Sequence, residues 1–354
     1  MKILHVDTEK GWRGGEQQLL YLIRGLREKG IKCAVACRVK GELEERCKAE
    51  GFKVIPLKGN QTSDVLRLGI VGREFDIVHA HSAKAHTISA LSKGIHKRPL
   101  IYTRRVDYKP KDNFITSFKY RKTDKVVAIS FAVKGILKEC YPWLEPEVIP
   151  SVVDSEEIER RVNPERVREI KGEFKGEPLI GTLAALTHQK DIPNFIEAAS
   201  IVLKELPKAK FVVFGEGKLR KELQRLIEVK GLKGRFKLFG FVEDVPNYTK
   251  ALDIFVLPSR NEGLGSSILI AMALKVPVIA TKVGGTVEVV KDGETGILVP
   301  PSNPRALAEA ILGVSKRKDL REELTKKAYA LVKERFSVES MVNSYLKVYG
   351  EVLK

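Results

Sequence analysis

Short runs of aliphatic and β-branched residues alternate with amphipathic helical patterns along nearly all of the 354 residues. The first run covers residues 3–7, a glycine-rich turn follows at 11–15, and apolar residues at helical spacing then continue to Leu26. Strands that alternate with helices in this way predict a parallel sheet with right-handed crossover connections. The other strand candidates of this half lie at 34–37, 53–57, 77–80, 100–103 and 126–130.

The strand pattern pauses between residues 148 and 178, where the chain is charged and carries prolines and glycines, which predicts a linker region with a helix in it. It then restarts, with candidates at 179–183, 211–214, 237–239, 254–257, 278–280 and 297–299. We therefore predict an α/β protein of two doubly wound, Rossmann-like domains that face a cleft, with ligands at the carboxyl ends of the strands. The predicted parts are a first domain at 1–160, a linker at 161–178, a second domain at 179–336, and a helix at 337–354 that packs back toward the first domain.

The positive charge of the chain is concentrated in one segment. There are 63 Lys and Arg residues against 45 Asp and Glu, a net charge of +18. Residues 81–140 hold fourteen of these basic residues and only four acidic ones. Such a concentration suits an anionic partner, whether nucleic acid, an anionic lipid surface or a phosphorylated small molecule. A solvated basic face without a partner explains the charge equally well.

Two classes of protein are excluded by composition. No apolar stretch reaches the roughly 18 residues that cross a bilayer, and the N-terminal residues lack the apolar segment of a signal peptide. We therefore expect a cytoplasmic location. The four cysteines are too few for a disulfide framework, and their spacing does not indicate a zinc site, so we expect reduced thiols.

The most informative segment runs from Pro258 to Pro301. A strand ends at Leu257, the chain turns through Glu262 and two glycines, and a helix begins near Ser266. Glycines let a backbone approach a ligand closely, and the amides at a helix start bind phosphate. A carboxylate beside that helix start accepts hydrogen bonds from hydroxyl groups. Diphosphate together with a polyol describes a nucleotide sugar.

This segment resembles the donor-site motif of the family 4 retaining glycosyltransferases of the GT-B fold, also called glycosyltransferase group 1. The resemblance extends over nearly the whole chain. The residues that carry it are Gly14-Gly15, His79-Ala80-His81, Pro150-Ser151, Lys190, Gly215-Glu216-Gly217, Glu262-Gly263-Leu264-Gly265, Ala271-Met272-Ala273, Pro277 to Thr281, Gly284-Gly285, Glu288, Asp292-Gly293 and Gly296 to Pro300.

The resemblance implies a role for each matching residue. Glu262 would hold the hydroxyls of the donor sugar, Lys190 would balance charge on the leaving phosphate, and His81 would lie beside the transferred sugar. The remaining donor-binding residues would be Gly14, Gly15, Gly215, Gly263, Leu264, Gly265, Ser266 and Ser267. The family needs neither a bound metal nor another cofactor, since the lysine and the helix dipole supply positive charge. Uridine or guanosine diphosphate donors are favoured.

The resemblance also implies a cell-envelope reaction. The product would be a polysaccharide or a lipid-linked, lipopolysaccharide-type glycan, made with retention of anomeric configuration. Arg104, Arg105 and Lys109 would lie on the acceptor or membrane side of the first domain, followed by aromatic residues at 114, 118 and 120 among further basic ones. This stretch fits peripheral contact with the inner face of an anionic membrane, or aromatic core residues with solvated charges. Nucleic acid is not an expected partner, because no nucleic-acid-binding module is present.

Two positions depart from the family pattern. The acid expected eight residues after Glu262 is Ile270, and the arginine expected five residues before Lys190 is Ala185. The main competing hypothesis is therefore a catalytically degenerate GT-B protein that binds a sugar nucleotide or a partner. The residues also leave open a sugar-nucleotide epimerase or phosphorylase, and a basic nucleic-acid-binding protein.

Overall fold

The computed structural model describes residues 1–175 and 177–354, which form two compact units. Unit 1 contains Met1–Ser151 together with Val338–Lys354, and unit 2 contains Val152–Ser337. Most of the stretch predicted as a linker, residues 161–178, is therefore part of unit 2, and residue 176 lies outside the described residues. The stretch holds a helix of its own, whose Phe174 packs on Phe214 and Phe239.

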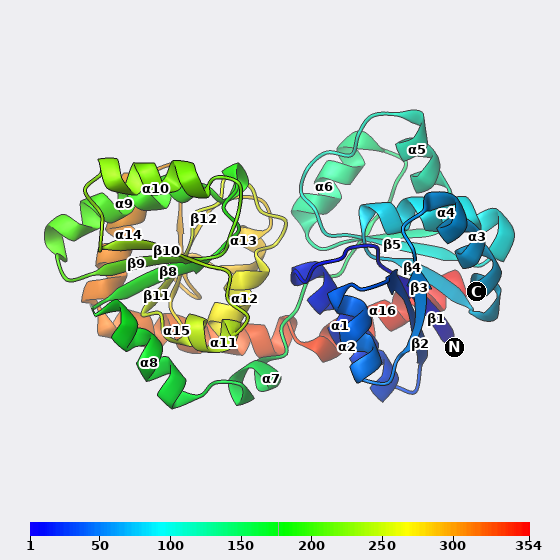
Figure 1. Ribbon diagram of the computed structural model, residues 1–354, viewed down its shortest axis with the longest axis horizontal. Coiled ribbons are helices and arrows are strands. Elements are labelled where there is room, and N and C mark those ends of the chain that lie inside the picture. Colours follow the sequence, from blue (N-terminus) through cyan, green and yellow to red (C-terminus); the bar gives the residue numbers. More distant parts are fainter. Residues whose placement is uncertain (176) are drawn as a thin grey trace. The chain divides into compact units, whose positions relative to one another are not determined.

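In the described chain, unit 1 is built on a seven-stranded parallel sheet with the order β3-β2-β1-β4-β5-β6-β7 (Figure 1). The order reverses between β1 and β4, which lie side by side although two other strands separate them in sequence. The last pairing, with the two-residue β7, is too short to leave a pattern in the sequence. The strands are β1 Lys2–Val6, β2 Lys32–Arg38, β3 Lys53–Leu57, β4 Ile77–Ala80, β5 Leu100–Arg104, β6 Lys125–Ala128 and β7 Glu147–Val148.

Helices cover both faces of this sheet. Several begin at a side chain that accepts a backbone N–H, such as Asn60 before α3 and Ser130 before α6. The last helix of the chain, α16, packs along α1, where a Cβ on Gly25 would lie 2.6 Å from Val342. The helices of unit 1 are α1 Gly14–Glu28, α2 Glu42–Ala49, α3 Gln61–Val71, the 3-10 turn η1 Gly72–Glu74, α4 Ala83–His96, α5 Phe114–Arg121, α6 Phe131–Cys140 and α16 Val338–Val352.

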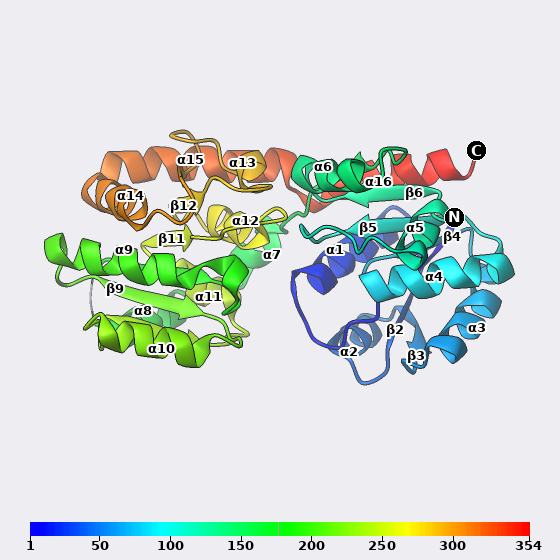
Figure 2. The same ribbon diagram turned by 90° about the horizontal axis from the view of Figure 1, so that it is seen from above.

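Unit 2 repeats this architecture with six parallel strands among its described residues, in the order β10-β9-β8-β11-β12-β13. Its helices also lie on both faces of the sheet (Figure 2). The strands are β8 Leu179–Leu183, β9 Lys210–Phe214, β10 Phe236–Gly240, β11 Ile254–Leu257, β12 Val278–Thr281 and β13 Ile297–Val299. The helices are α7 Ser155–Arg160, α8 Pro164–Phe174, η2 His188–Lys190, α9 Ile192–Glu205, α10 Arg220–Val229, α11 Val245–Lys250, α12 Ser266–Ala273, α13 Thr286–Val289, α14 Pro304–Lys316 and α15 Lys318–Arg335.

The predicted α/β class with two doubly wound parallel sheets is confirmed. Each strand predicted from the sequence is present, with ends that differ by at most two residues. The four cysteines are free thiols, two of them fully buried. None of the helices in the described residues is both long and apolar enough to span a bilayer.

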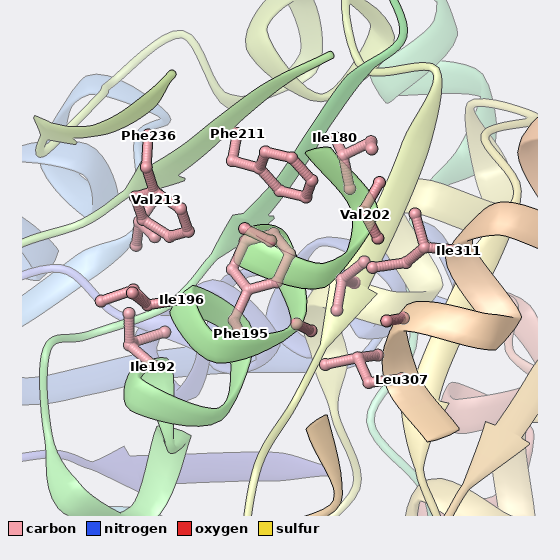
Figure 3. Close-up of a cluster of buried hydrophobic side chains, with 14 of the residues drawn as sticks. Ile180, Ile192, Phe195, Ile196, Val202, Phe211, Val213, Phe236, Leu307 and Ile311 are labelled. Atoms are coloured by element: carbon pink, nitrogen blue, oxygen red, sulfur yellow. The ribbon is translucent and has the colours of Figure 1, made fainter. Parts of the chain in front are cut away.

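The core of unit 2 lies between the sheet and the helices α9 and α14 (Figure 3). Phe195 of α9 is fully buried, and its ring centroid lies 5.6 Å from that of Phe211 and 5.3 Å from that of Phe236. Edge-to-face pairs at this spacing add to the free energy gained by burying the rings. Leu307 and Ile311 of α14 complete the cluster.

We predict that Phe195→Ala lowers the free energy of unfolding by about 3–5 kcal/mol, because it removes two ring contacts and leaves a cavity. Val229→Ala is the matched control, since Val229 is 82% exposed at the end of α10, and we expect a change below about 0.5 kcal/mol. Denaturant unfolding measures both. Equal effects of the two substitutions would contradict the assignment of Phe195 to the core.

Candidate active site

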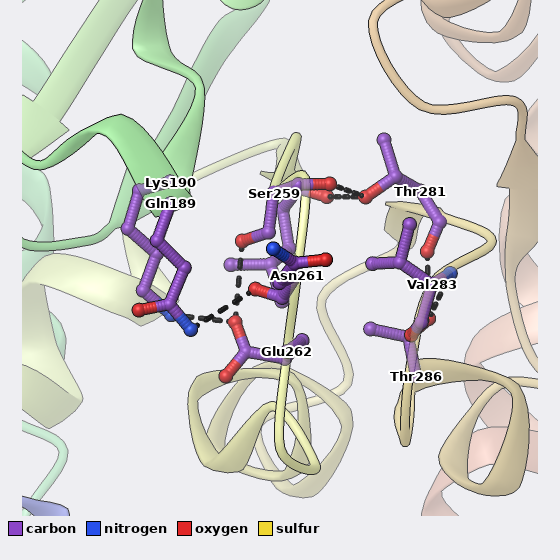
Figure 4. Close-up of polar contacts among 9 residues, drawn as sticks. Gln189, Lys190, Ser259, Asn261, Glu262, Thr281, Val283 and Thr286 are labelled. Carbon is purple, nitrogen blue, oxygen red and sulfur yellow. Dashed lines mark hydrogen bonds and ion pairs between the residues drawn. The ribbon is translucent and has the colours of Figure 1, made fainter. Parts of the chain in front are cut away.

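In unit 2, an ion pair lies at the carboxyl ends of the central strands (Figure 4). Lys190 ends the turn that follows β8, and Glu262 lies in the loop that follows β11. The ammonium nitrogen of Lys190 is 2.5 Å from Oε2 of Glu262, and the hydroxyl of Ser259 donates to the same oxygen at 3.2 Å. Both side chains are mostly shielded from solvent. The structure thus brings together the two residues that the sequence predicted as catalytic in this half of the chain.

Two glycines set the shape of the Glu262 loop. Gly284 has φ +47°, and a Cβ there would lie 2.0 Å from the carbonyl oxygen of Glu262. A Cβ on Gly285 would lie 2.2 Å from the carbonyl oxygen of Gly263. The Gly285 amide donates to the backbone carbonyl oxygen of Glu262 at 3.0 Å. Only glycine allows the two loops to approach this closely. The pair of glycines therefore lets this segment pack on the backbone of Glu262 and Gly263.

The helix that follows this loop begins without a side-chain cap. The residue before α12, Gly265 with φ +90°, has no side chain to accept from the first amides, although the amide of Ile268 donates to the Gly265 carbonyl oxygen at 2.8 Å. Ser266 and Ser267 are the first two helical residues and are half-buried, while Gly263 and Leu264 are buried before them. The amide groups of such a helix start attract an anion.

The loop of Lys190 is held by contacts with neighbouring loops. Gly215 has φ +154°, and a Cβ there would lie 2.0 Å from the carbonyl oxygen of Ala184, so this glycine permits close packing. The guanidinium of Arg260 pairs with the buried Asp191 at 3.0 Å. This second cation was not predicted from the sequence, where its only signal was its position two residues before Glu262.

The two departures from the family pattern lie in the same region of unit 2. Ala185 is exposed in the loop after β8, beside Gly215. Ile270 is half-buried within α12. Neither side chain offers a polar group to a ligand. Arg260 provides a cation near the loop in which Ala185 lacks one.

In unit 1, four of the predicted site residues come together. Gly14 and Gly15 begin α1 after β1, and His81 follows β4, the neighbouring strand. A Cβ on Gly15 would lie 3.6 Å from Cδ of Arg105, and the guanidinium of Arg105 is 3.5 Å from Nδ1 of His81.

The other two basic residues predicted on this side have separate partners. Arg104 is buried and donates to the hydroxyl of Tyr120 at 3.2 Å and to the carbonyl oxygen of Tyr108. Lys109 is exposed and pairs with Glu139 at 2.5 Å. Adjacent arginines therefore differ: Arg104 holds the loop after β5, and Arg105 faces the glycine turn.

His81 belongs to a buried group of three histidines. His5, His79 and His81 have ring nitrogens within 4.8 Å of one another, the one such group among the described residues. Burial lowers the pKa of His5 to about 3 and those of the other two well below the usual value, so all three are neutral at pH 7.

The histidine group fits a hydrogen-bond network better than a metal site. The two nitrogens of His79 bond the hydroxyls of Tyr349 and Thr103, both at 2.8 Å, and so are already engaged. The cation of Arg105 beside His81 would also repel a metal ion.

Two buried carboxyl groups hold the turn between β1 and α1. Asp7 accepts from the amide of Glu9 at 2.8 Å, and Glu16 accepts from the amide of Arg13 at 2.7 Å. Burial raises the pKa of Asp7 to about 6. Burial and then the charge of Asp7 raise the pKa of Glu16 to about 7.

The comparisons with known proteins agree with this geometry. Residues 163–331 match the model of the family described as glycosyl transferases group 1, and residues 12–157 match that of glycosyltransferase family 4. An uncharacterised glycosyltransferase of Methanocaldococcus jannaschii is 31% identical over 78% of this chain and 76% of its own. An Escherichia coli galactosyltransferase that acts on GlcNAc-diphosphoundecaprenol is 28% identical over 70% of this chain and 68% of its own.

A solved structure shows the same fold. Anabaena HepE, crystallised with UDP-glucose, superposes with a TM-score of 0.88 at 22% identity, over 99% of this chain and 100% of its own.

We predict that Asp7 and Glu16 lower stability as pH rises from about 4 to about 7. Their folded pKa values lie above the usual 3.8 and 4.5, so the folded state binds more protons than the unfolded state in this range. The double variant Asp7→Asn with Glu16→Gln keeps both acceptor oxygens. Between pH 4 and pH 8, the free energy of unfolding of this variant should rise relative to that of the wild type by on the order of 2 kcal/mol per carboxyl group.

Urea unfolding of both proteins across this pH range provides the measurement. The difference between their free energies of unfolding reports on the two carboxyl groups alone. The histidines are common to both proteins, and their lowered pKa values make stability rise with pH instead. If the free energies of unfolding of the two proteins changed in parallel with pH, burial would not raise the pKa of either carboxyl group.

Proposed function

Because the chain belongs to the family 4, group 1 glycosyltransferases, we propose that it is a retaining enzyme that transfers a sugar from a nucleotide-sugar donor to a polysaccharide or lipid-linked acceptor. The observation that carries this proposal is the Lys190–Glu262 pair next to the start of α12, a helix whose first amides receive no side-chain cap from Gly265. A carboxylate for hydroxyls and a cation with helix amides for phosphates match the two halves of a nucleotide sugar.

The donor is a uridine or guanosine diphosphate sugar in this proposal. HepE binds UDP-glucose, which supports the uridine series. Glu262 accepts hydrogen bonds from the sugar, and Lys190 and the α12 amides bind the diphosphate. These groups supply positive charge without a metal ion. Arg260 is the cation best placed to replace the arginine missing at Ala185.

Transfer breaks the bond between the anomeric carbon and the diphosphate oxygen and forms one to the acceptor oxygen on the same face of the sugar. The proton of the acceptor hydroxyl passes to the leaving diphosphate. The carboxylate of Glu262 already accepts from Lys190 and Ser259, an arrangement that suits binding more than attack on the sugar. This favours direct transfer with retention over a covalent intermediate.

The acceptor is a lipid-linked glycan at an anionic membrane surface in this proposal, which places the protein in the cytoplasm at the inner face of that membrane. The Escherichia coli relative acts on a diphosphoundecaprenol acceptor. In unit 1, Phe114 is 83% exposed and Phe131 is 66% exposed. Arg121 and Lys122 lie over the rings of Trp143 and Phe118. Exposed aromatic residues among cations suit a membrane interface.

The second candidate, a binding protein without transferase activity, is favoured by Ala185 and Ile270, which provide no polar contact to a donor. It predicts that UDP or GDP raises the melting temperature while no sugar conjugate is turned over. At 100 times its dissociation constant, a ligand adds about 2.7 kcal/mol to stability, so a thermal-shift screen detects binding by either candidate.

We predict that Lys190→Met and Glu262→Gln each lower kcat at least about 100-fold, since each removes an interaction with the reacting part of the donor. Nucleotide release from UDP- and GDP-sugars with lipid-linked acceptors measures the rate, and the anomeric proton signal of the product reports retention. Only Lys190→Met should also weaken binding of UDP itself.

Lys204→Met is the matched control, because Lys204 is exposed on α9 away from the loop of Lys190. It should retain the wild-type rate. Wild-type rates in both site variants would refute the assignment of the site, and a product of inverted configuration would refute the proposed stereochemistry.

We predict that Phe114→Asp lowers binding to vesicles of phosphatidylglycerol about tenfold or more, because it replaces an inserted ring by a repelled charge. Leu66→Asp adds the same charge at another exposed apolar residue of unit 1, on α3, and should leave binding within twofold. Sedimentation with vesicles measures both. If the two variants bind equally, this surface does not contact membranes.

A further inference from the structure

Arg105 lies between the glycine turn and His81 with unused donor groups. Its Nε is buried and has no hydrogen-bond partner among the described residues, and its terminal nitrogen is 3.5 Å from Nδ1 of His81. Burial raises the pKa of Asp7 and the charge of Arg105 partly offsets this, yet no ion pair within 4.0 Å joins the two in the described part of the chain. The guanidinium can therefore donate to a ligand.

The other nitrogen of His81 is bound to a second histidine. Nε2 of His81 is 3.0 Å from Nδ1 of His5, and both rings are buried. This contact depends on the parallel pairing of β1 with β4, which places residue 5 opposite residue 79. A neutral imidazole has one nitrogen that donates and one that accepts, so the two rings must share one proton arrangement.

Each possible arrangement leaves one donor unmatched. If Arg105 donates to Nδ1 of His81, then His81 donates to His5, and the proton of His5 lies on Nε2, which has no partner among the described residues. If His5 instead donates, the proton of His81 lies on Nδ1 and points at a guanidinium, which cannot accept it. Neither tautomer arrangement of His5 and His81 therefore satisfies every donor.

We propose that Nδ1 of His81 and the guanidinium of Arg105 together bind an anionic oxygen of a substrate, a phosphate or carboxylate, with His5 as the positioning residue that sets the tautomer of His81. In the second arrangement, an anionic oxygen would accept one hydrogen bond from Nδ1 of His81 and another from the guanidinium of Arg105, so that both donors have a partner. The amides at the start of α1, beside Arg105 at Gly15, add positive potential. The inference names a substrate class and rests on the proposed function.

The charge of Arg105 acts on Asp7, and the charges of Asp7 and Glu9 act on Glu16. Asp7 and Glu16 are already engaged by the backbone amides of Glu9 and Arg13. Because burial raises the pKa of both carboxyl groups, protonated forms of each are available near neutral pH, which reduces their competition with a bound anion.

The test is nuclear magnetic resonance of the full-length protein labelled with ¹⁵N at its six histidines, which reports directly which ring nitrogen carries the proton. The spectrum of His81→Asn identifies the His81 signals. Methyl phosphate and UDP are titrated separately. We expect the ring proton of His81 to lie on Nε2 in the free protein and on Nδ1 when the anion binds.

Arg105→Gln should weaken binding of the responsible anion at least tenfold. Arg67→Gln is the control of equal charge change on the exposed face of α3 and should stay within twofold. If methyl phosphate still moves the His81 signals with UDP already bound, the anion belongs to the acceptor. If UDP alone moves them and blocks methyl phosphate, the anion is the donor diphosphate.

Two variants of His5 separate positioning from structural support. His5→Asn keeps a polar atom near the position of Nδ1 and should keep anion binding within about threefold, whereas His5→Phe should lose about tenfold and leave His81 in a mixture of tautomers. Melting temperatures confirm that both variants fold.

The inference is overturned if neither anion moves the His81 signals, or if Arg105→Gln binds like wild type. Because these are binding measurements, they are independent of turnover. Failure of the proposed function would appear instead as anion binding without sugar transfer.

Discussion

The reversal of strand order in each sheet determines where chemistry can occur. In unit 1, β1 and β4 are neighbours, and in unit 2, β8 and β11 are neighbours, although other strands lie between them in sequence. Connections leave such a pair toward opposite faces, so the loops at their carboxyl ends diverge and leave room for a ligand. Gly14, His81, Lys190 and Glu262 each follow one of these four strands. The candidate residues of each unit therefore depend on the same topological feature.

The Lys190–Glu262 pair joins the loop that follows β8 to the loop that follows β11. Two opposite charges held largely away from water neutralise each other, whereas either alone would be costly to bury. In the proposed function, a nucleotide sugar would offer a partner to each, hydroxyls for the carboxylate and phosphate for the ammonium. Binding would then replace one set of charge-assisted bonds by another and leave no charge uncompensated.

The sequence was sufficient for all of the described strands except the two-residue β7, because the alternation of apolar runs and helical patterns has a clear period. It was also sufficient to single out Glu262, an acid among glycines before a helix. It did not reveal that Lys190 touches Glu262, because 72 residues separate them and the contact depends on β8 pairing with β11. The family resemblance proposed a role for Lys190, and the contact emerged only from the fold.

Neighbouring residues show a second limit of sequence reasoning. Arg104 and Arg105 were assigned to one surface, but Arg104 is buried against Tyr120 and Arg105 lies beside Gly15. Side chains of successive residues at a strand end point in opposite directions, so partners must be known to separate them. The stretch before β8 was predicted to be a linker with a helix in it. The helix is present as α8, but its packing within unit 2 depends on contacts that the sequence does not show.

The path of the chain has a consequence for how the protein is made. Unit 2 is inserted within unit 1, since α16 returns to pack on α1 and to place the hydroxyls of Tyr345 and Tyr349 against Thr103 and His79. During synthesis, the first unit to emerge from the ribosome is thus the last to be completed. Until the final residues are translated, its histidine network lacks two hydroxyl partners, while unit 2 already has its entire sequence. Chaperone protection of the nascent chain would be needed most at the uncovered face of α1.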